Sequence, residues 1–220
     1  MPGHIWRKSS NGGIMKKIYQ REAVAYMEFF DICDENGNPT GSTIERTEAH
    51  RLGICHRTAH VWIIREKDGR YQVLLQKRSA EKDSFPGRFD TSSAGHIRAG
   101  DEPAESAVRE LAEELGIQEQ PSELNFAGKF RVRYEKEFHG KMFKDNEVAF
   151  VYVYRRPVDE KALVLQKEEV ECVEWFDMED VLEGCRRHDR KFCVPAEGLV
   201  TAKRYVEGER LIFENENKKT

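Results

Sequence analysis

The sequence predicts an α+β fold, in which a mixed β-sheet is sandwiched between α-helices. Three observations support this class. Runs rich in Val, Ile, Leu and aromatic residues occur in pairs around turn signals, only a few segments show helical periodicity, and strands and helices do not alternate regularly. Regular alternation would favour a parallel α/β sheet, whereas paired strands with a few helices are typical of α+β proteins. We find no internal repeat in the 220 residues.

Turn residues place the first four strands in two hairpins. Asn-Gly and Asn-Pro pairs within residues 34–40 mark the first turn, and Lys-Asp-Gly-Arg at 67–70 marks the second. Pro86 and Gly87 then form a loop before a short extended segment. We expect strands or extended segments at Phe29–Cys33, Ser42–Arg46, Arg57–Arg65, Tyr71–Lys77 and Phe89–His96.

The second half of the chain combines long strands with helices. A polar stretch at 139–146 is expected to be a loop between two strands. We expect strands at Asn125–Phe138, Glu147–Arg155 and Cys172–Phe176, and helices at about Asp101–Leu115, Met178–Cys185 and Pro195–Val206. Gly116 ends the first of these helices as its C-cap.

The chain divides into five segments. Residues 1–26 contain five Lys or Arg residues and only one acid, and they lack the apolar run of a secretory signal. We interpret them as a flexible basic extension, or as the product of a start codon placed too far upstream, with Met15 and Met27 as alternative starts. The remaining segments are a β-hairpin region at 27–56 leading into the domain, the domain at 57–190, a C-terminal helix at 191–213 and a frayed tail at 214–220.

Composition excludes several classes of protein. Apolar residues form 39% of the chain, and the longest apolar runs, such as Val148–Tyr154, are far shorter than the roughly 18 residues of a membrane span. The formal charge of −4 argues against nucleic-acid binding. Five cysteines without a CxxC pair argue against a disulfide framework or a cysteine zinc site. We therefore expect a cytoplasmic protein with no membrane or nucleic-acid partner.

The helix at about 101–115 concentrates acidic residues beside an apolar stripe. Glu110 and Glu114 are four residues apart and Glu113 is three from Glu110, so the three carboxylates share one flank of the helix. Such a cluster is either a solvated helix face or a cation site. Hard divalent ions such as Mg²⁺ and Mn²⁺ take carboxylate oxygens together with substrate phosphate oxygens, which would suit a bound diphosphate.

The segment from Gly95 to Ile117 resembles the Nudix box, Gly-x5-Glu-x7-Arg-Glu-U-x-Glu-Glu-x-Gly-U, where U is aliphatic. Eight of the nine defined positions match, and the departure is Asp101 in place of glutamate. The resemblance covers about Arg57 to Phe176 and implies the Nudix fold. An alternative role for Asp101 is simply that of a helix N-cap.

The resemblance implies Mg²⁺- or Mn²⁺-dependent hydrolysis of a diphosphate linkage in a small molecule. Glu110, Glu113 and Glu114 would bind metal, and Glu113 or Glu114 would also act on the attacking water. Arg109 would be an ion-paired brace, Gly95 would give the backbone room before the helix, and Gly116 would complete the motif.

A second resemblance is to isopentenyl-diphosphate isomerase, a branch of the same family, and rests on residues 74–78, Lys82, 85–87 and 91–96. It implies a metal centre of three histidines and two acids, and the positions that correspond are His50, His56, His96, Asp145 and Glu147. That isomerase carries a catalytic cysteine two residues before the last histidine, and this chain has Ala94 there. Alanine cannot transfer a proton, so hydrolysis is favoured. Isomerase activity and a non-catalytic nucleotide sensor stay as alternatives.

Further residues have two interpretations each. Lys77, Arg78 and Lys82 would meet substrate phosphates or form an exposed basic strand end. Glu147 would contact metal or act as a catalytic base. The hairpin at 29–46 offers an edge that could pair with a second copy of the chain to form a homodimer, and the sequence leaves the oligomeric state open.

Overall fold

The structure is a computed structural model that describes residues 27–82, 84–138 and 140–217. The expectations for the extension at 1–26 and for residues 218–220 therefore lie outside the described residues.

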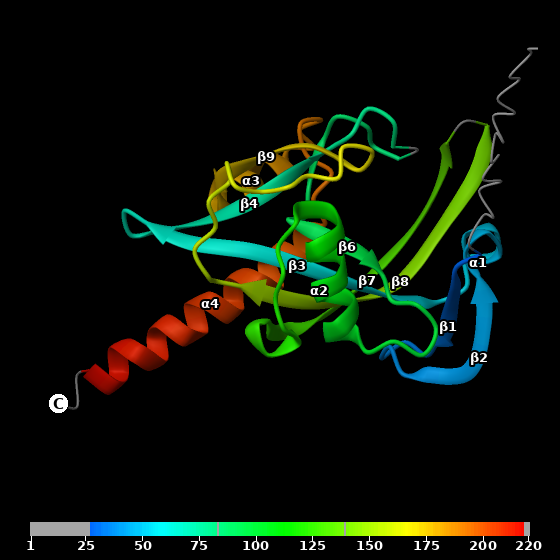
Figure 1. Cartoon of the computed structure of the whole chain (residues 1–220), viewed down its shortest axis with the longest axis horizontal. Helices are drawn as coiled ribbons and strands as arrows, with labels where there is room; N and C mark the ends of the chain where they lie inside the picture. The colour runs from blue at the N-terminus through cyan, green and yellow to red at the C-terminus, as the bar shows by residue number, and fades with distance from the viewer. Residues whose placement is uncertain (1–26, 83, 139, 218–220) are drawn as a thin grey trace, which may run out of the picture.

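A seven-stranded sheet lies at the centre of the molecule (Figure 1). Its strands are β3 (His56–Lys67), β4 (Arg70–Arg78), β5 (Phe89–Asp90), β6 (Ser93–His96), β7 (Asn125–Phe138), β8 (Lys141–Tyr154) and β9 (Val170–Asp177). The order is β5-β4-β3-β8-β7, with β6 pairing with β3 and β9 with β4. β3 and β8 are parallel and the other pairs are antiparallel, so the sheet is mixed, as predicted.

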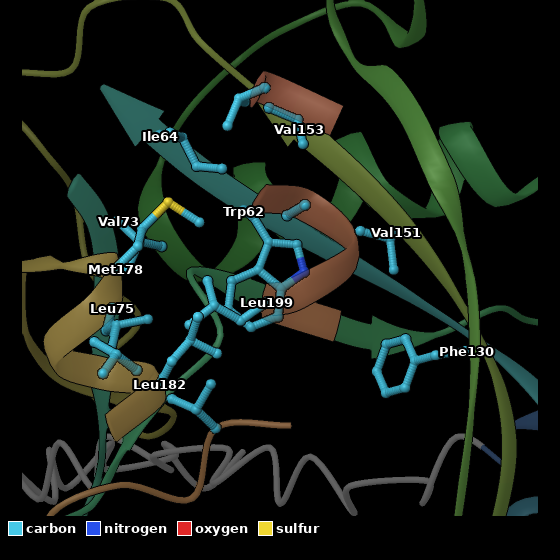
Figure 2. Close-up of a cluster of buried hydrophobic side chains, with 14 of the residues drawn as sticks. Trp62, Ile64, Val73, Leu75, Phe130, Val151, Val153, Met178, Leu182 and Leu199 are labelled. Carbon is cyan, nitrogen blue, oxygen red and sulfur yellow. The ribbon is translucent and has the colours of Figure 1, made fainter. Parts of the chain in front are cut away.

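Helices cover both faces of this sheet, because the central strand β3 is apolar on both sides. Trp62 and Ile64 belong to one buried cluster, which Figure 2 shows with Leu199. Val61 and Ile63 point the other way and pack in a second cluster. The first face is covered by α3 (Met178–Arg186) and α4 (Ala196–Asn217), and the second by α2 (Pro103–Leu115). The predicted α+β sandwich is confirmed.

A separate two-stranded sheet and a short helix lie beside the parallel pair β3 and β8 (Figure 1). These elements are β1 (Phe29–Cys33), β2 (Pro39–Glu45) and α1 (Arg46–Leu52). The β1–β2 turn is held by Asp34, whose carboxylate accepts hydrogen bonds from the backbone N–H groups of Asn36 and Asn38 at 2.8 and 2.9 Å. The predicted hairpin is therefore present, and its second strand begins earlier than expected.

Helix α1 was not predicted. It has only seven residues, and a polar segment of that length carries little helical periodicity. Its ends explain why it forms. The Glu45 carboxylate accepts a hydrogen bond from the backbone N–H of Glu48, and Gly53 ends the helix in the left-handed conformation with φ of 72°.

Strand β8 starts at Lys141, so the predicted polar loop at 139–146 is wrong over 141–146. The register pairs Tyr134 of β7 with Asp145 of β8 and reaches Phe138 opposite Lys141. This stretch is polar because one side of the strand faces the cleft described below, where Asp145 is buried. Its charged residues therefore hide the strand pattern.

Two helix boundaries also differ from the prediction. α2 begins at Pro103 with Glu102 as its N-cap, so Asp101 is not the cap. Asp101 instead accepts a hydrogen bond at its backbone carbonyl from Arg57 at 3.2 Å. α4 runs from Ala196 to Asn217, because no proline or turn sequence interrupts it, so it passes the expected helix end at Val206 and includes residues 214–217 of the predicted frayed tail. Among the described residues, none of the helices has the length and apolar character needed to cross a membrane.

Candidate functional site

A cleft of about 1020 Å³ opens between α2, the hairpin β7–β8 and the N-terminal elements. Most of the predicted site residues line it: His50, Arg78, Lys82, Gly95, His96, Arg109, Glu110, Glu113, Glu114, Asp145 and Glu147. His56 is fully buried directly behind this wall. Predicted site residues that lie far apart in the sequence, from His50 to Glu147, therefore line one cleft.

The three glutamates of α2 form one wall of the cleft but differ in exposure. The side chain of Glu113 is 48% exposed and that of Glu110 only 14%. Glu114 is buried, and it accepts hydrogen bonds from the Ala94 backbone N–H at 3.2 Å and from Gln76 Nε2 at 3.5 Å. Burial raises the pKa of Glu110 and raises that of Glu114 to about 8. Burial therefore disfavours the charged forms of both carboxylates, and a cation bound beside them would stabilise those forms.

Gly95 lies directly against this wall. A Cβ atom at position 95 would stand 2.1 Å from Cδ of Glu110, so only glycine leaves room for that carboxylate. Arg109 braces the same region: Nη1 lies 2.7 Å from Glu110 Oε1 and donates to Glu113 Oε2 at 3.2 Å, while Nη2 donates to the His96 carbonyl at 3.0 Å. Strand β6 and helix α2 are therefore locked together at the site.

Three histidines and an acid meet in a second cluster in the cleft. His50 comes from α1, His56 and His96 from neighbouring strands, and Glu147 from β8, and one ligand atom from each lies within 4.8 Å of the others. The parallel register sets His56 opposite Glu147. Nε2 of His56 and of His96 lie 3.5 and 3.6 Å from Glu147 Oε1. Asp145 joins them, with Oδ1 3.9 Å from His50 Nε2.

Two of the three histidines are oriented by hydrogen bonds at Nδ1, which leave their Nε2 atoms facing the cluster. Nδ1 of His50 bonds the Arg46 carbonyl at 2.8 Å, and Nδ1 of His56 bonds the Ile54 carbonyl at 2.9 Å. Nε2 of all three histidines and Oδ1 of Asp145 are buried without a hydrogen-bond partner. Two imidazoles oriented through Nδ1, and three unpartnered Nε2 atoms that face carboxylates, fit a bound metal ion.

Burial also sets the protonation of this cluster. It lowers the pKa of His50, His56 and His96, and it raises the pKa of Asp145 and of Glu147 to about 7. Thr58 Oγ1 donates to Glu147 Oε2 at 3.1 Å and fixes the second oxygen of that carboxylate. Because burial lowers the pKa of the three histidines, it favours the neutral form of imidazole, which is the form that binds metals.

A family model described as the NUDIX domain matches residues 55–194. The chain belongs to the Nudix family. The resemblance of residues 95–117 to the Nudix box is thus part of a match over most of the chain. In the structure the box runs from the end of β6 through the whole of α2.

Relatives and solved structures agree with this assignment. Nudix hydrolase 3 from Arabidopsis thaliana is 43% identical over 164 residues, which cover 74% of this chain and 21% of the plant protein. The chain thus spans about a fifth of the length of that relative. Isopentenyl-diphosphate Delta-isomerase from Cereibacter sphaeroides is 32% identical over 149 residues, covering 68% of this chain and 78% of the isomerase.

A solved structure supports the Nudix fold. The crystal structure of DR0079 from Deinococcus radiodurans aligns with a TM-score of 0.55 at 20% identity, covering 73% of this chain and 90% of that one. At this identity the likeness concerns the fold alone.

Not every residue predicted for the site lines the cleft. Lys77 is not among the lining residues, and it pairs with Glu171 at 2.7 Å, because alternation along β4 directs only its neighbour Arg78 toward the cleft. Arg78 is held by Asp90 at 3.0 Å, and Lys82 pairs with Glu169. Of the three residues predicted to bind phosphate, Arg78 and Lys82 line the cleft and Lys77 does not.

The two remaining positions of the box have structural contacts. Asp101 does not line the cleft and contributes its backbone carbonyl to Arg57. Gly116 ends α2 with φ of 72°, and a Cβ atom there would lie 2.9 Å from Val164 Cβ. Both residues therefore shape the segments around α2 instead of contacting the cleft.

Several cleft residues were missed by sequence reasoning. Arg46 and Arg98 line the cleft and share one carboxylate, Glu28, at 2.9 and 3.7 Å. Arg46 precedes His50 by one helical turn, so a prediction of α1 would have placed both residues on the same side of that helix. Gln76 and Thr58, which bond the buried glutamates, have no distinguishing mark in the sequence.

Proposed function

We propose that this protein is a metal-dependent hydrolase that cleaves a diphosphate linkage in a nucleoside diphosphate derivative or a small organic diphosphate, with Mg²⁺ or Mn²⁺ as the ion. The observation that carries the proposal is the wall formed by Glu110, Glu113 and Glu114 in a cleft that also contains Arg78 and Lys82. Carboxylates suit a hard divalent cation, and the cations suit substrate phosphates.

The glutamates of α2 would hold the divalent ion, with Arg109 keeping Glu110 and Glu113 in place. A bound ion of this kind neutralises phosphate charge and lowers the pKa of a coordinated water. Glu114 is oriented by Gln76 and by the backbone of Ala94, so its carboxylate has a fixed direction before substrate arrives. Arg78 and Lys82 would orient the phosphates.

Three acids are proposed to take part in proton transfer: Glu113, Glu114 and Glu147. For Glu147 the support is that burial raises its pKa to about 7 in the metal-free protein, and a group with a pKa near the working pH accepts and returns a proton effectively. Its neighbours His50, His56, His96 and Asp145 would hold a second cation, since their unpartnered atoms converge there.

Isopentenyl-diphosphate isomerase activity is the second candidate. The observation that favours it is the cluster of three histidines with Asp145 and Glu147, together with the 32% identity to the Cereibacter sphaeroides isomerase. Ala94 speaks against it, because this residue of the cleft wall has a methyl group where proton transfer would need a thiol.

A screen for diphosphate cleavage, in which the products are separated by liquid chromatography and identified by mass spectrometry, tests the proposal. Nucleoside diphosphates, nucleotide sugars, coenzyme A and prenyl diphosphates are each incubated with and without Mn²⁺, using the wild type and Glu114→Gln. Metal-dependent formation of the cleavage products, such as the two phosphomonoesters from a nucleotide sugar, that Glu114→Gln abolishes supports hydrolysis. Formation of dimethylallyl diphosphate from isopentenyl diphosphate would instead support the isomerase, and tight binding without turnover would support a nucleotide sensor.

A further inference from the structure

Two cysteines meet beside the histidine cluster. Cys33 is the last residue of β1 and Cys55 immediately precedes His56, and their Sγ atoms lie 3.5 Å apart. The backbone N–H of Cys33 donates to the Cys55 carbonyl at 3.0 Å, so the two chain segments are already joined. We propose that Cys33 and Cys55 are a site of reversible oxidation, forming a disulfide that fastens the end of β1 to the start of β3.

The geometry requires little movement. All five cysteines are free thiols, and those of Cys185 and Cys193 contact the backbone carbonyls of Val194 and Phe89. A disulfide has an S–S length of about 2.05 Å, so the two sulfurs must approach by about 1.5 Å from their present distance. The existing backbone hydrogen bond limits how far the segments can separate.

The two thiols differ in solvent exposure, and this difference determines which of them reacts first with an oxidant. Cys33 is buried, with 5% of its surface exposed, whereas Cys55 is partly exposed. Cys55 therefore meets an external oxidant first. Its thiolate attacks a low-molecular-weight disulfide and expels one thiol, leaving a mixed disulfide. The Cys33 sulfur then attacks Cys55 Sγ and expels the second thiol. Two cysteine thiols are oxidised, one external disulfide is reduced, and both protons pass to the released thiols.

The position of this pair links it to the candidate metal centre. The loop that the bond would close, residues 33–55, contains α1 with His50 and ends one residue before His56. Two of the three histidines are thus tethered by the same bond. The link to metal binding rests on the proposed role of these histidines, whereas the oxidation itself does not depend on that role.

The first test detects the bond directly. The full chain is incubated with glutathione disulfide and digested without reduction, and the peptides are identified by mass spectrometry. We expect a Cys33–Cys55 linked peptide with the loss of two hydrogens, reversed by dithiothreitol and missing in Cys55→Ser and Cys33→Ser. Cys172→Ser, which leaves the pair intact, is the matched control and should form the linked peptide. Cys33 and Cys55 recovered as unlinked peptides from the oxidised wild type would overturn the proposal.

A second measurement follows the consequence. Closing a loop of this size restricts the unfolded chain, so the oxidised wild type should unfold at a temperature higher by on the order of 5 °C, with no such rise in Cys55→Ser. Mn²⁺ titration of oxidised and reduced protein then tests the link to the histidines. Because peptide mapping needs no turnover, a linked peptide in a protein without hydrolase activity would leave this inference standing while refuting the proposed function.

Discussion

Replacing Gly95 by alanine should move the Glu110 carboxylate while leaving the stability of the fold nearly unchanged. The added Cβ would stand 2.1 Å from Cδ of Glu110, and ordinary contacts begin near 3.4 Å, so the Glu110 carboxylate must move by more than about 1 Å. The backbone of Gly95 does not have a positive φ, and the crowded atom is the end of a side chain that can rotate. The clash should therefore displace Glu110 without unfolding the protein.

A displacement of this size has a predictable kinetic cost. Misplacing a catalytic group by about 1 Å costs on the order of 10²-fold in rate, which equals about 2.7 kcal/mol in the activation free energy. We expect kcat/KM of Gly95→Ala to fall by that factor with the substrate found in the screen. The free energy of unfolding, measured in urea, should change by no more than about 1 kcal/mol.

Gly208→Ala is the matched control, because this helical glycine has nothing within 4 Å of the added Cβ. It should retain full activity and gain up to about 1 kcal/mol of stability. Unchanged kcat/KM in Gly95→Ala would show that the position of Glu110 does not matter for catalysis. A large loss of stability would show instead that the clash spreads into the core.

Three further predictions test other parts of the structure. Without metal, burial raises the pKa of Asp145 and Glu147 to about 7 and that of Glu114 to about 8. The contribution of these groups to the free energy of unfolding is fully present below their unfolded pKa near 4, and it is lost as the pH rises from there to about 8. Mn²⁺ should therefore raise Tm more at pH 8 than at pH 6, and an equal rise at both would contradict this. Arg109→Met should lower kcat by at least about tenfold with a smaller change in Tm, since it releases two carboxylates of the cleft wall; unaltered kcat would exclude the brace. Leu199→Ala should reduce the unfolding free energy by about 2–5 kcal/mol in urea, because it leaves a cavity beside the central strand.

The sequence was most informative where chemistry and helical periodicity coincide. The acids of α2 follow a fixed spacing beside an apolar stripe, so both the helix and its flank were predicted, and Gly116 marked its end. Strand β3 was equally clear because it is apolar on both faces. In these elements local pattern and tertiary packing favour the same structure.

Prediction failed where polar residues of the cleft interrupt the hydrophobic pattern of a strand, and where a helix is short. Asp145 is a buried strand residue in the cleft, yet in the sequence it belongs to a polar stretch that looks like a turn, whereas Glu147 was expected as the first residue of the strand. The short helix α1 depends on a capping carboxylate and on tertiary contacts more than on its own composition. Lys77 and Arg78 differ only by the alternation of a strand, which separates a surface ion pair from a residue of the cleft.

The region matched by the family model does not include the whole histidine cluster proposed to bind a metal ion. The family match begins at residue 55, whereas His50 lies ahead of it in α1. A fragment trimmed to the matched region would keep the glutamate helix and lose one imidazole together with the hairpin that shelters it. Recombinant designs based on this fold should therefore start upstream of β1 if the histidine-rich half of the cleft is to be complete.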